Sequence, residues 1–300
     1  MMLGAQLALA RGWATLPGAK VAAAPSEAMA VPPKPLGQRP EVAPEGEGDG
    51  AMRLSFEGCK AMAKEVQDVC WQALARQQAE VDALGALDVC VHIVDRELGL
   101  ECVDDVAEAI TLRDRGHAEQ ICGGVTDRKW RGQCWFGVGL AWAETDAAYA
   151  LSRCAKAEAF ERFCRHDVVG EVSLVDVDAG VAFCAAEEAN PANDELTRKT
   201  CWHGISKYLA RRSIREAALS CGRATEGWRG TCFHGLGWGA AERDVEDTLS
   251  TCPRYGAYAD YCTQGVAHQL KRSDPTRALA LCEALQTDTI RTRCVDFVSR

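Results

Sequence analysis

The chain has 300 residues, with 43 acidic against 34 basic side chains and a formal net charge of −9. This balance argues against nucleic acid as a partner, because binding phosphates needs a basic face. No apolar run approaches the roughly 18 residues of a membrane-spanning helix, so the sequence predicts no membrane span. Hydrophobic residues make up 47% of the chain, which is enough to build a packed core.

The first fifty residues differ from the rest. Seven of the ten prolines fall between Pro17 and Pro44, and residues 25–50 show no apolar periodicity. We therefore expect residues 1–50 to form a disordered, proline-rich tether preceded by a weak signal-like segment, whose short apolar run is broken by Arg11. The folded domain is expected to span residues 51–300.

Sixteen cysteines follow in a regular series. Such a number at regular spacing is typical of disulfides formed in an oxidising compartment. The second cysteine of each pair always stands 20 residues before the first cysteine of the next, whereas the separation inside a pair varies from 10 to 17. The chain therefore reads as eight units of about 31 residues, each with one variable loop. The pairs are Cys59–Cys70, Cys90–Cys102, Cys122–Cys134, Cys154–Cys164, Cys184–Cys201, Cys221–Cys232, Cys252–Cys262 and Cys282–Cys294.

Each unit after the first is expected to open with a helix. A residue suited to cap a helix stands 12 positions after each second cysteine, and its side-chain oxygen can accept a hydrogen bond from an unpaired helical amide. Pro275 follows the last of these caps at the first helical position. The predicted caps are Asp82, Asp114, Asp146, Asp176, Ser213, Asp244 and Asp274.

A second helix is expected around the second cysteine of each unit. Apolar residues stand four positions before and four after that cysteine, which makes one stripe of an amphipathic helix. The preceding column is Val66, Leu98, Trp130, Phe160, Thr197, Trp228, Tyr258 and Ile290, and the following column is Leu74, Val106, Val138, Val168, Ile205, Leu236, Val266 and Val298.

These elements predict an all-α protein, a right-handed solenoid of eight αα-hairpins. A disulfide inside each hairpin joins Cα atoms about 5.5 Å apart, which suits two helices packed at the usual distance. The architecture is similar to that of tetratricopeptide and Sel1-like arrays, including cysteine-rich secreted versions with a bridge in each hairpin. The resemblance is one of architecture, and it assigns no residue roles.

The recurring glycines and aromatics allow structural interpretations. Gly137, Gly204, Gly235 and Gly265, three positions after a bonded cysteine, are expected to let a partner helix approach closely. Four aromatics directly after the second cysteine are expected to fill the core, and alternatively would line a binding groove. These aromatics are Trp71, Trp135, Trp202 and Phe233.

A mostly polar column lies two positions after the second cysteine. It is interpreted either as a solvated or hydrogen-bonded row, or as a ligand-facing stripe centred on His203 and His234. Helix spacing puts equivalent positions on the order of 10 Å apart, which argues against a shared zinc ion. The column reads Gln72, Asp104, Phe136, His166, His203, His234, Gln264 and Asp296, and the candidate ligand-binding residues are His166, His203, His234, Gln264, Trp202 and Phe233.

Signatures of catalysis are absent from the sequence, and the adjacent carboxylate pairs Asp104/Asp105 and Glu187/Glu188 are expected to be solvated. We expect a non-enzymatic, extracytoplasmic scaffold, whether periplasmic, cell-surface or secreted, that binds a protein, peptide or glycan and needs no cofactor or metal. Two alternatives stay open. One is a thiolate metal store that uses the sixteen cysteines, and the other is an enzyme whose site converges around His203 and His234.

Overall fold

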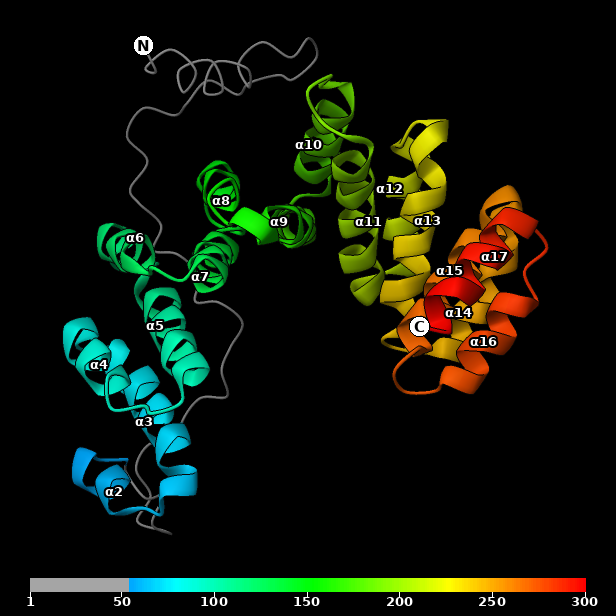
Figure 1. Cartoon of the computed structure of the whole chain (residues 1–300). Helices are drawn as coiled ribbons and strands as arrows, with labels where there is room; N and C mark the ends of the chain where they lie inside the picture. The colour runs from blue at the N-terminus through cyan, green and yellow to red at the C-terminus, as the bar shows by residue number, and fades with distance from the viewer. Residues whose placement is uncertain (1–53) are drawn as a thin grey trace, which may run out of the picture. The chain divides into compact units, whose positions relative to one another are not determined.

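The computed structural model describes residues 54–300, and the chain divides into two units between Asp49 and Gly50. The predicted signal-like segment and tether, residues 1–50, lie outside the described residues. Residues 54–300 are helical throughout, without strands, as the sequence predicts (Figure 1). None of the helices in this range combines the length and apolar character that crossing a membrane requires.

The helices follow one another as pairs, and one disulfide bridges each pair. We call the first member the A helix, the second the B helix, and each pair a hairpin. The A helices are α2 (Phe56–Ala61), α4 (Ala83–Cys90), α6 (Arg115–Gly124), α8 (Ala147–Cys154), α10 (Val177–Ala189), α12 (Ile214–Arg223), α14 (Val245–Thr251) and α16 (Pro275–Glu283). The B helices are α3 (Lys64–Ala79), α5 (Arg96–Ile110), α7 (Arg128–Ala141), α9 (Glu161–Val175), α11 (Glu195–Arg212), α13 (Glu226–Ala241), α15 (Ala259–Leu270) and α17 (Asp288–Val298). Short 3₁₀ segments, η2 (Glu158–Phe160) and η3 (Cys252–Tyr258), precede α9 and α15.

All eight predicted disulfides are present, and no cysteine is free. The Cα atoms they join lie 5.3 to 5.7 Å apart, close to the predicted distance. Each bond closes a loop that constrains the unfolded chain and is worth about 3 kcal/mol in the chain-entropy model. This local closure stabilises helices that, at 6 to 18 residues, are marginal as isolated segments.

The seven predicted caps are also confirmed. In each case the side chain accepts a hydrogen bond from the backbone N–H three residues later, as Asp82 does from Gly85 and Asp274 from Arg277. The same arrangement occurs at Asp114, Asp146, Asp176, Ser213 and Asp244. The A helices after α2 therefore begin where the sequence predicts.

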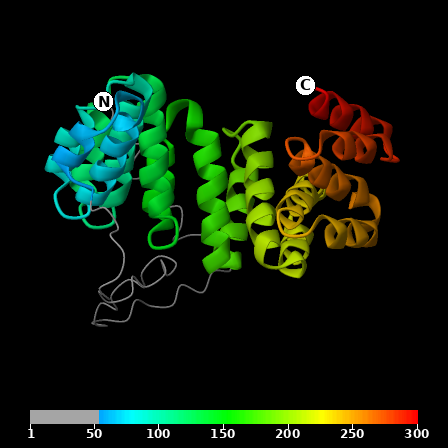
Figure 2. The ribbon, with the colours of Figure 1, turned by 90° about the horizontal axis from the view of Figure 1, so that it is seen from below.

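The B helices form a continuous layer. Each B helix packs against the preceding and following B helices, and the closest packing is among α9, α11, α13 and α15. The A helices barely touch one another, and the small contact between α10 and α12 is the largest among them. Each A helix after α2 instead lies against its own B helix and the one before it, and α2 lies against α3. Figure 2 shows the helices side by side in chain order.

The predicted apolar stripe is half right. The column four residues after the second cysteine is buried in every hairpin, from Leu74 to Val298. The column four residues before it is buried only at Ile290, and Val66 is exposed. The earlier turn of each B helix lies at the loop edge, where the A helix no longer covers it, so the amphipathic pattern there marks a partial contact.

Glycine and aromatic positions serve packing. The side chains of Trp71, Trp135, Trp202 and Phe233 are buried, which confirms that they fill the core. At Gly204, Gly235 and Gly265 an added Cβ would overlap the backbone carbonyl oxygen of the residue at the polar-column position in the preceding B helix. The B helices of hairpins four to seven therefore touch backbone to backbone.

Candidate functional site

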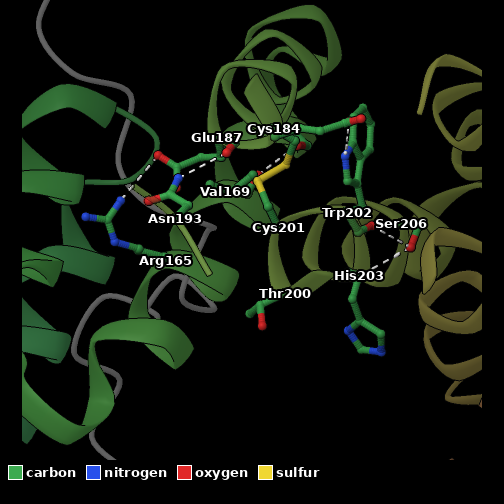
Figure 3. Close-up of a disulfide and its surroundings, with 12 residues drawn as sticks. Arg165, Val169, Cys184, Glu187, Asn193, Thr200, Cys201, Trp202, His203 and Ser206 are labelled. Carbon is green, nitrogen blue, oxygen red and sulfur yellow. Dashed lines mark hydrogen bonds and ion pairs between the residues drawn. A yellow bond between two sulfur atoms is a disulfide. The ribbon is translucent and has the colours of Figure 1, made fainter. Parts of the chain in front are cut away.

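The polar column lies on the side of the B helices turned away from the A helices. Successive residues are about 100° apart around a helix, so positions two and six after the bonded cysteine lie at about 200° and 240° from it. Figure 3 shows the result in hairpin five, where His203 points away from the Cys184–Cys201 bond and from α10. We call this side of the B layer the free face.

Four histidines meet on the free face in a continuous row. His166 Nε2 lies 2.9 Å from His203 Nδ1, and His234 Nε2 lies 2.9 Å from His268 Nδ1. The two pairs meet where the His203 and His234 ring centroids are 5.1 Å apart. These residues come from α9, α11, α13 and α15, so the imidazole row crosses four consecutive hairpins.

This row contradicts the predicted separation of about 10 Å between neighbouring columns. Helix axes can lie that far apart while long side chains bridge the gap, and here the glycines shorten it further. His203 is followed by Gly204 and His234 by Gly235, and each glycine sits on the backbone of the preceding B helix. The neighbouring imidazoles are thereby brought into direct contact. Among residues 54–300, no group of three or more His, Cys, Asp or Glu side chains is arranged to hold a metal ion.

A carboxylate anchors one end of the row. Asp167 Oδ1 lies 2.6 Å from His166 Nδ1. Burial raises the pKa of Asp167, but the hydrogen bonds with His166 and Tyr208 and the nearby Lys207 charge outweigh burial and lower that pKa overall. An ionised carboxylate only accepts hydrogen bonds, so His166 Nδ1 carries the proton that it donates.

Burial keeps the other imidazoles neutral at pH 7. It lowers the pKa of His234 to about 3, with help from His268, and the pKa of His268 to about 4, with help from Lys271. The pKa of His203 is also well below its usual value, first through burial and then through the neighbouring His234 and His166. A neutral imidazole donates from one nitrogen and accepts at the other, which is the pattern that the His166–His203 and His234–His268 hydrogen bonds require.

Aromatic and cationic side chains surround the row. Trp238 contacts three of the imidazoles edge-on, with centroid distances of 5.7 Å to His203, 5.9 Å to His234 and 6.1 Å to His268. Lys207 Nζ stands 5.2 Å from the Trp238 ring, and Phe297 packs 4.1 Å from His268. These contacts shield the imidazoles from water and account for their lowered pKa values.

The predicted site residues divide into two groups. The structure brings His166, His203 and His234 together, whereas Trp202 and Phe233 are buried away from the free face, where Trp202 Nε1 donates to Glu188. Gln264 shares the column on α15, and among the described residues no hydrogen bond joins it to the row. The residues that sequence reasoning missed are His268, Trp238, Lys207 and Tyr208. All of them lie six or seven positions after a bonded cysteine, one turn beyond the column, and that turn is the signal that could have found them.

The adjacent carboxylates are not simply solvated, contrary to the prediction. Asp104 is only 9% exposed, and its Oδ1 has no hydrogen-bond partner. Burial, followed by the charges of Glu108, Asp105 and Glu101, raises the pKa of Asp104 to about 8. Asp105 instead pairs with Arg76, at 2.6 Å.

The other predicted carboxylate pair, Glu187 and Glu188, is hydrogen-bonded within hairpin five. Glu187 accepts from Asn193 at 2.8 Å, and Glu188 accepts from Trp202 Nε1 at 3.1 Å. Figure 3 shows Glu187 near the Cys184–Cys201 bond, with Asn193 beside it. The two glutamates also contact the neighbouring hairpins, since Glu187 pairs with Arg165 of α9 at 3.5 Å and Glu188 accepts from the Thr225 hydroxyl just before α13. The acidic loop of this hairpin is therefore held by contacts within the hairpin and across to its neighbours.

A polar cavity of about 300 Å³ opens at the loop edge between hairpins four and five. The long segment between Cys184 and Cys201 contributes part of its wall. The lining residues are Glu158, Ala159, Glu161, Arg162, Arg165, Asn193, Asp194 and Thr197. None of these lining residues belongs to the imidazole row.

Comparison with known proteins gives no relative. No family model, no curated protein and no solved structure matches the chain. What the geometry supports therefore comes from these residues alone. All sixteen cysteine sulfurs are joined in disulfides, so in this structure no cysteine is present as a thiolate that could hold a metal.

Proposed function

We propose that the protein is a non-enzymatic, extracytoplasmic scaffold, a right-handed solenoid of eight repeats that binds a protein, peptide or glycan on its free face. Eight disulfides favour an oxidising location, because the cytosol keeps thiols reduced. Stacked hairpins, each contacting mainly its neighbours, favour an extended recognition surface.

The observation that carries the proposal is the composition of the free face around hairpins four and five. Phe163 on α9 and Leu196 on α11 are 64% and 48% exposed. Both come before the bonded cysteine on the B helices that hold His166 and His203. Exposed apolar side chains beside polar and aromatic groups are typical of a binding surface.

The test compares the exposed apolar residues of the free face with an exposed leucine on an A helix. The oxidised chain is screened on peptide and glycan arrays, and the ligands found are titrated against a Phe163→Ser, Leu196→Ser variant. We expect their binding to weaken by about tenfold or more, the scale of losing an apolar anchor. The control is Leu219→Ser on the A helix α12, where Leu219 is also exposed.

Ligands that bind the free-face variant and the control variant equally well would contradict the proposal. That result would move the binding surface to the A helices or the loop edge. Both variants should keep the far-ultraviolet dichroism of the parent, so that a loss of binding reports on the surface and not on unfolding.

A further inference from the structure

Two turns of α5 carry more negative charge than their neighbours neutralise. The carboxylates are Glu101, Asp104, Asp105 and Glu108. Arg76 of α3 makes two hydrogen bonds with Asp105, at 2.6 and 2.7 Å, so its guanidinium is committed to that carboxylate. The other three carboxylates form no ion pair within residues 54–300. Repulsion on this part of α5 is therefore left without a countercharge from the chain itself.

Asp104 and Glu108 converge on one point beside α7. A Cβ atom added at Gly137 would lie 3.5 Å from Asp104 Oδ1 and 3.1 Å from Glu108 Oε2. Asp104 is only 9% exposed, and this same Oδ1 has no hydrogen-bond partner. Glu108 is exposed, so the pair is open to water on its side. A buried carboxylate oxygen aimed at a second carboxylate needs a positive charge at that point, either a proton or a metal ion.

We propose that Asp104 and Glu108 bind one Ca²⁺ ion over Gly137. Ca²⁺ takes carboxylate oxygens and water as ligands, and its flexible coordination suits two carboxylates four residues apart on one helix. Mg²⁺ fits less well, because it loses its water reluctantly and Asp104 Oδ1 is closed to water. Two carboxylates are fewer side chains than a closed metal site has, so water on the Glu108 side completes the shell and the affinity is modest.

The ion takes the place of a proton. In the metal-free chain burial, followed by the charge of Glu108, raises the pKa of Asp104, so this carboxyl keeps its proton near neutral pH. Binding of Ca²⁺ releases that proton to water and leaves both carboxylates ionised. The two oxygens converge beside Gly137 only when α5 and α7 are packed, so the ion should stabilise the folded chain. The site belongs to hairpin two and does not depend on ligand binding at hairpins four and five.

The experiment follows thermal unfolding of the full oxidised chain after a chelator has removed bound metal. CaCl₂ is compared with NaCl of equal ionic strength, because salt alone screens the net charge of −9. With a dissociation constant on the order of 10⁻³ M, about 10 mM CaCl₂ should raise the unfolding midpoint by roughly 2 to 6 °C over NaCl. MgCl₂ at the same concentration should give a smaller rise.

Four variants locate the ion. Asp104→Asn and Glu108→Gln each remove one carboxylate, and either should lower the apparent Ca²⁺ affinity by about tenfold or more. Gly137→Ala keeps every charge but fills the point of convergence, so it should weaken binding as well. Asp88→Asn, at an exposed carboxylate of α4, is the control and should keep the full rise.

Three results would overturn the site. The first is an equal midpoint in CaCl₂ and in NaCl of the same ionic strength. The second is a Ca²⁺ effect that Asp104→Asn and Gly137→Ala both retain, which would place the ion elsewhere. The third is a larger rise with MgCl₂, which would contradict the assignment to Ca²⁺. Asp104→Asn removes a buried acid and Gly137→Ala meets only flexible side-chain ends, so both should fold, which helical dichroism and a count of zero free thiols establish.

Discussion

At five B-helix glycines, a side chain as small as a methyl group would overlap the backbone of a neighbouring B helix. They are Gly204, Gly235, Gly237, Gly239 and Gly265. Glycine in a helix normally costs up to about 1 kcal/mol relative to alanine. Here that cost is offset by contacts that a larger residue would prevent. The imidazole row depends on this close approach, because the histidines of the polar column directly precede Gly204 and Gly235.

Two glycines of one helix make a direct test at this scale. In Gly239→Ala the new methyl group would collide with the carbonyl oxygen of Lys207, so we expect a loss of about 1–3 kcal/mol or more in unfolding free energy. Gly227→Ala, also in α13, meets nothing within 4 Å, and its stability should be unchanged or slightly raised. Urea unfolding followed by circular dichroism measures both. Equal effects of the two substitutions would show that α11 and α13 are farther apart than described.

At the scale of packed helices, the imidazole row should make the folding stability of hairpins four to seven fall in acid. Unfolded histidines bind protons near pH 6.5, but in the folded chain the pKa of His234 is about 3 and that of His268 about 4. The unfolded state therefore binds more protons as the pH falls through this window, and the folded state loses stability. Asp167 is the carboxylate that contacts the row, while Lys207 and Lys271 add positive charge.

We expect the unfolding free energy to drop by about a few kcal/mol between about pH 7 and about pH 4, because the unfolded histidines take up protons in this range and the buried ones do not. His234→Gln keeps a hydrogen-bonding side chain without the titration, so its drop should be smaller than that of the parent chain. His117→Gln, at a partly exposed histidine on α6 that pairs with Asp114, should follow the parent chain. If His234→Gln shows the same pH dependence as the parent, the row does not control acid stability.

The contact between α5 and α7, where Asp104 lies, should lose stability as the pH rises, whereas the imidazole row loses stability as the pH falls. The pKa of Asp104 is about 8 in the folded chain against 3.8 ordinarily, so the folded state retains a proton that the unfolded state has lost. Stability therefore falls as the pH rises from about 4 to about 8, and the decline levels off above that range. Asp104→Asn should flatten this decline in denaturant titrations at rising pH. Asp88→Asn, at an exposed carboxylate of α4, should keep the decline.

How far the sequence predicts each element depends on the range of the interactions. Caps such as Asp82 and Ser213 are recognisable because the hydrogen bond they make lies three residues away. The disulfides are recognisable because each closes a short loop of nearly constant geometry. The contact between His234 and His268 is not, since it joins residues 34 apart and depends on the distance between two helices. That distance is set by Gly265 against a backbone carbonyl, which is visible only in three dimensions.

For the whole molecule, oxidation state is the property to measure first. Complete reduction of eight disulfides should add about 16 Da to the intact mass, two hydrogens per bond, and the unreduced protein should show no free thiol when denatured. Removing one bridge, as in Cys221→Ala with Cys232→Ala, should cost about 3 kcal/mol. Free thiols together with a bound metal in the native protein would instead support the thiolate store.

No sulfur bridge joins one hairpin to another, and this has a mechanical consequence. A chain pulled from its ends can part between hairpins at the glycine-lined contacts, while every closed loop holds 10 to 17 residues out of the extensible length. In each separated hairpin, the residues between the two bonded cysteines cannot be extended until the disulfide is reduced. Stretching should therefore be stepwise and limited in extent. A reducing agent should then release the chain length closed in the eight disulfide loops, in eight increments.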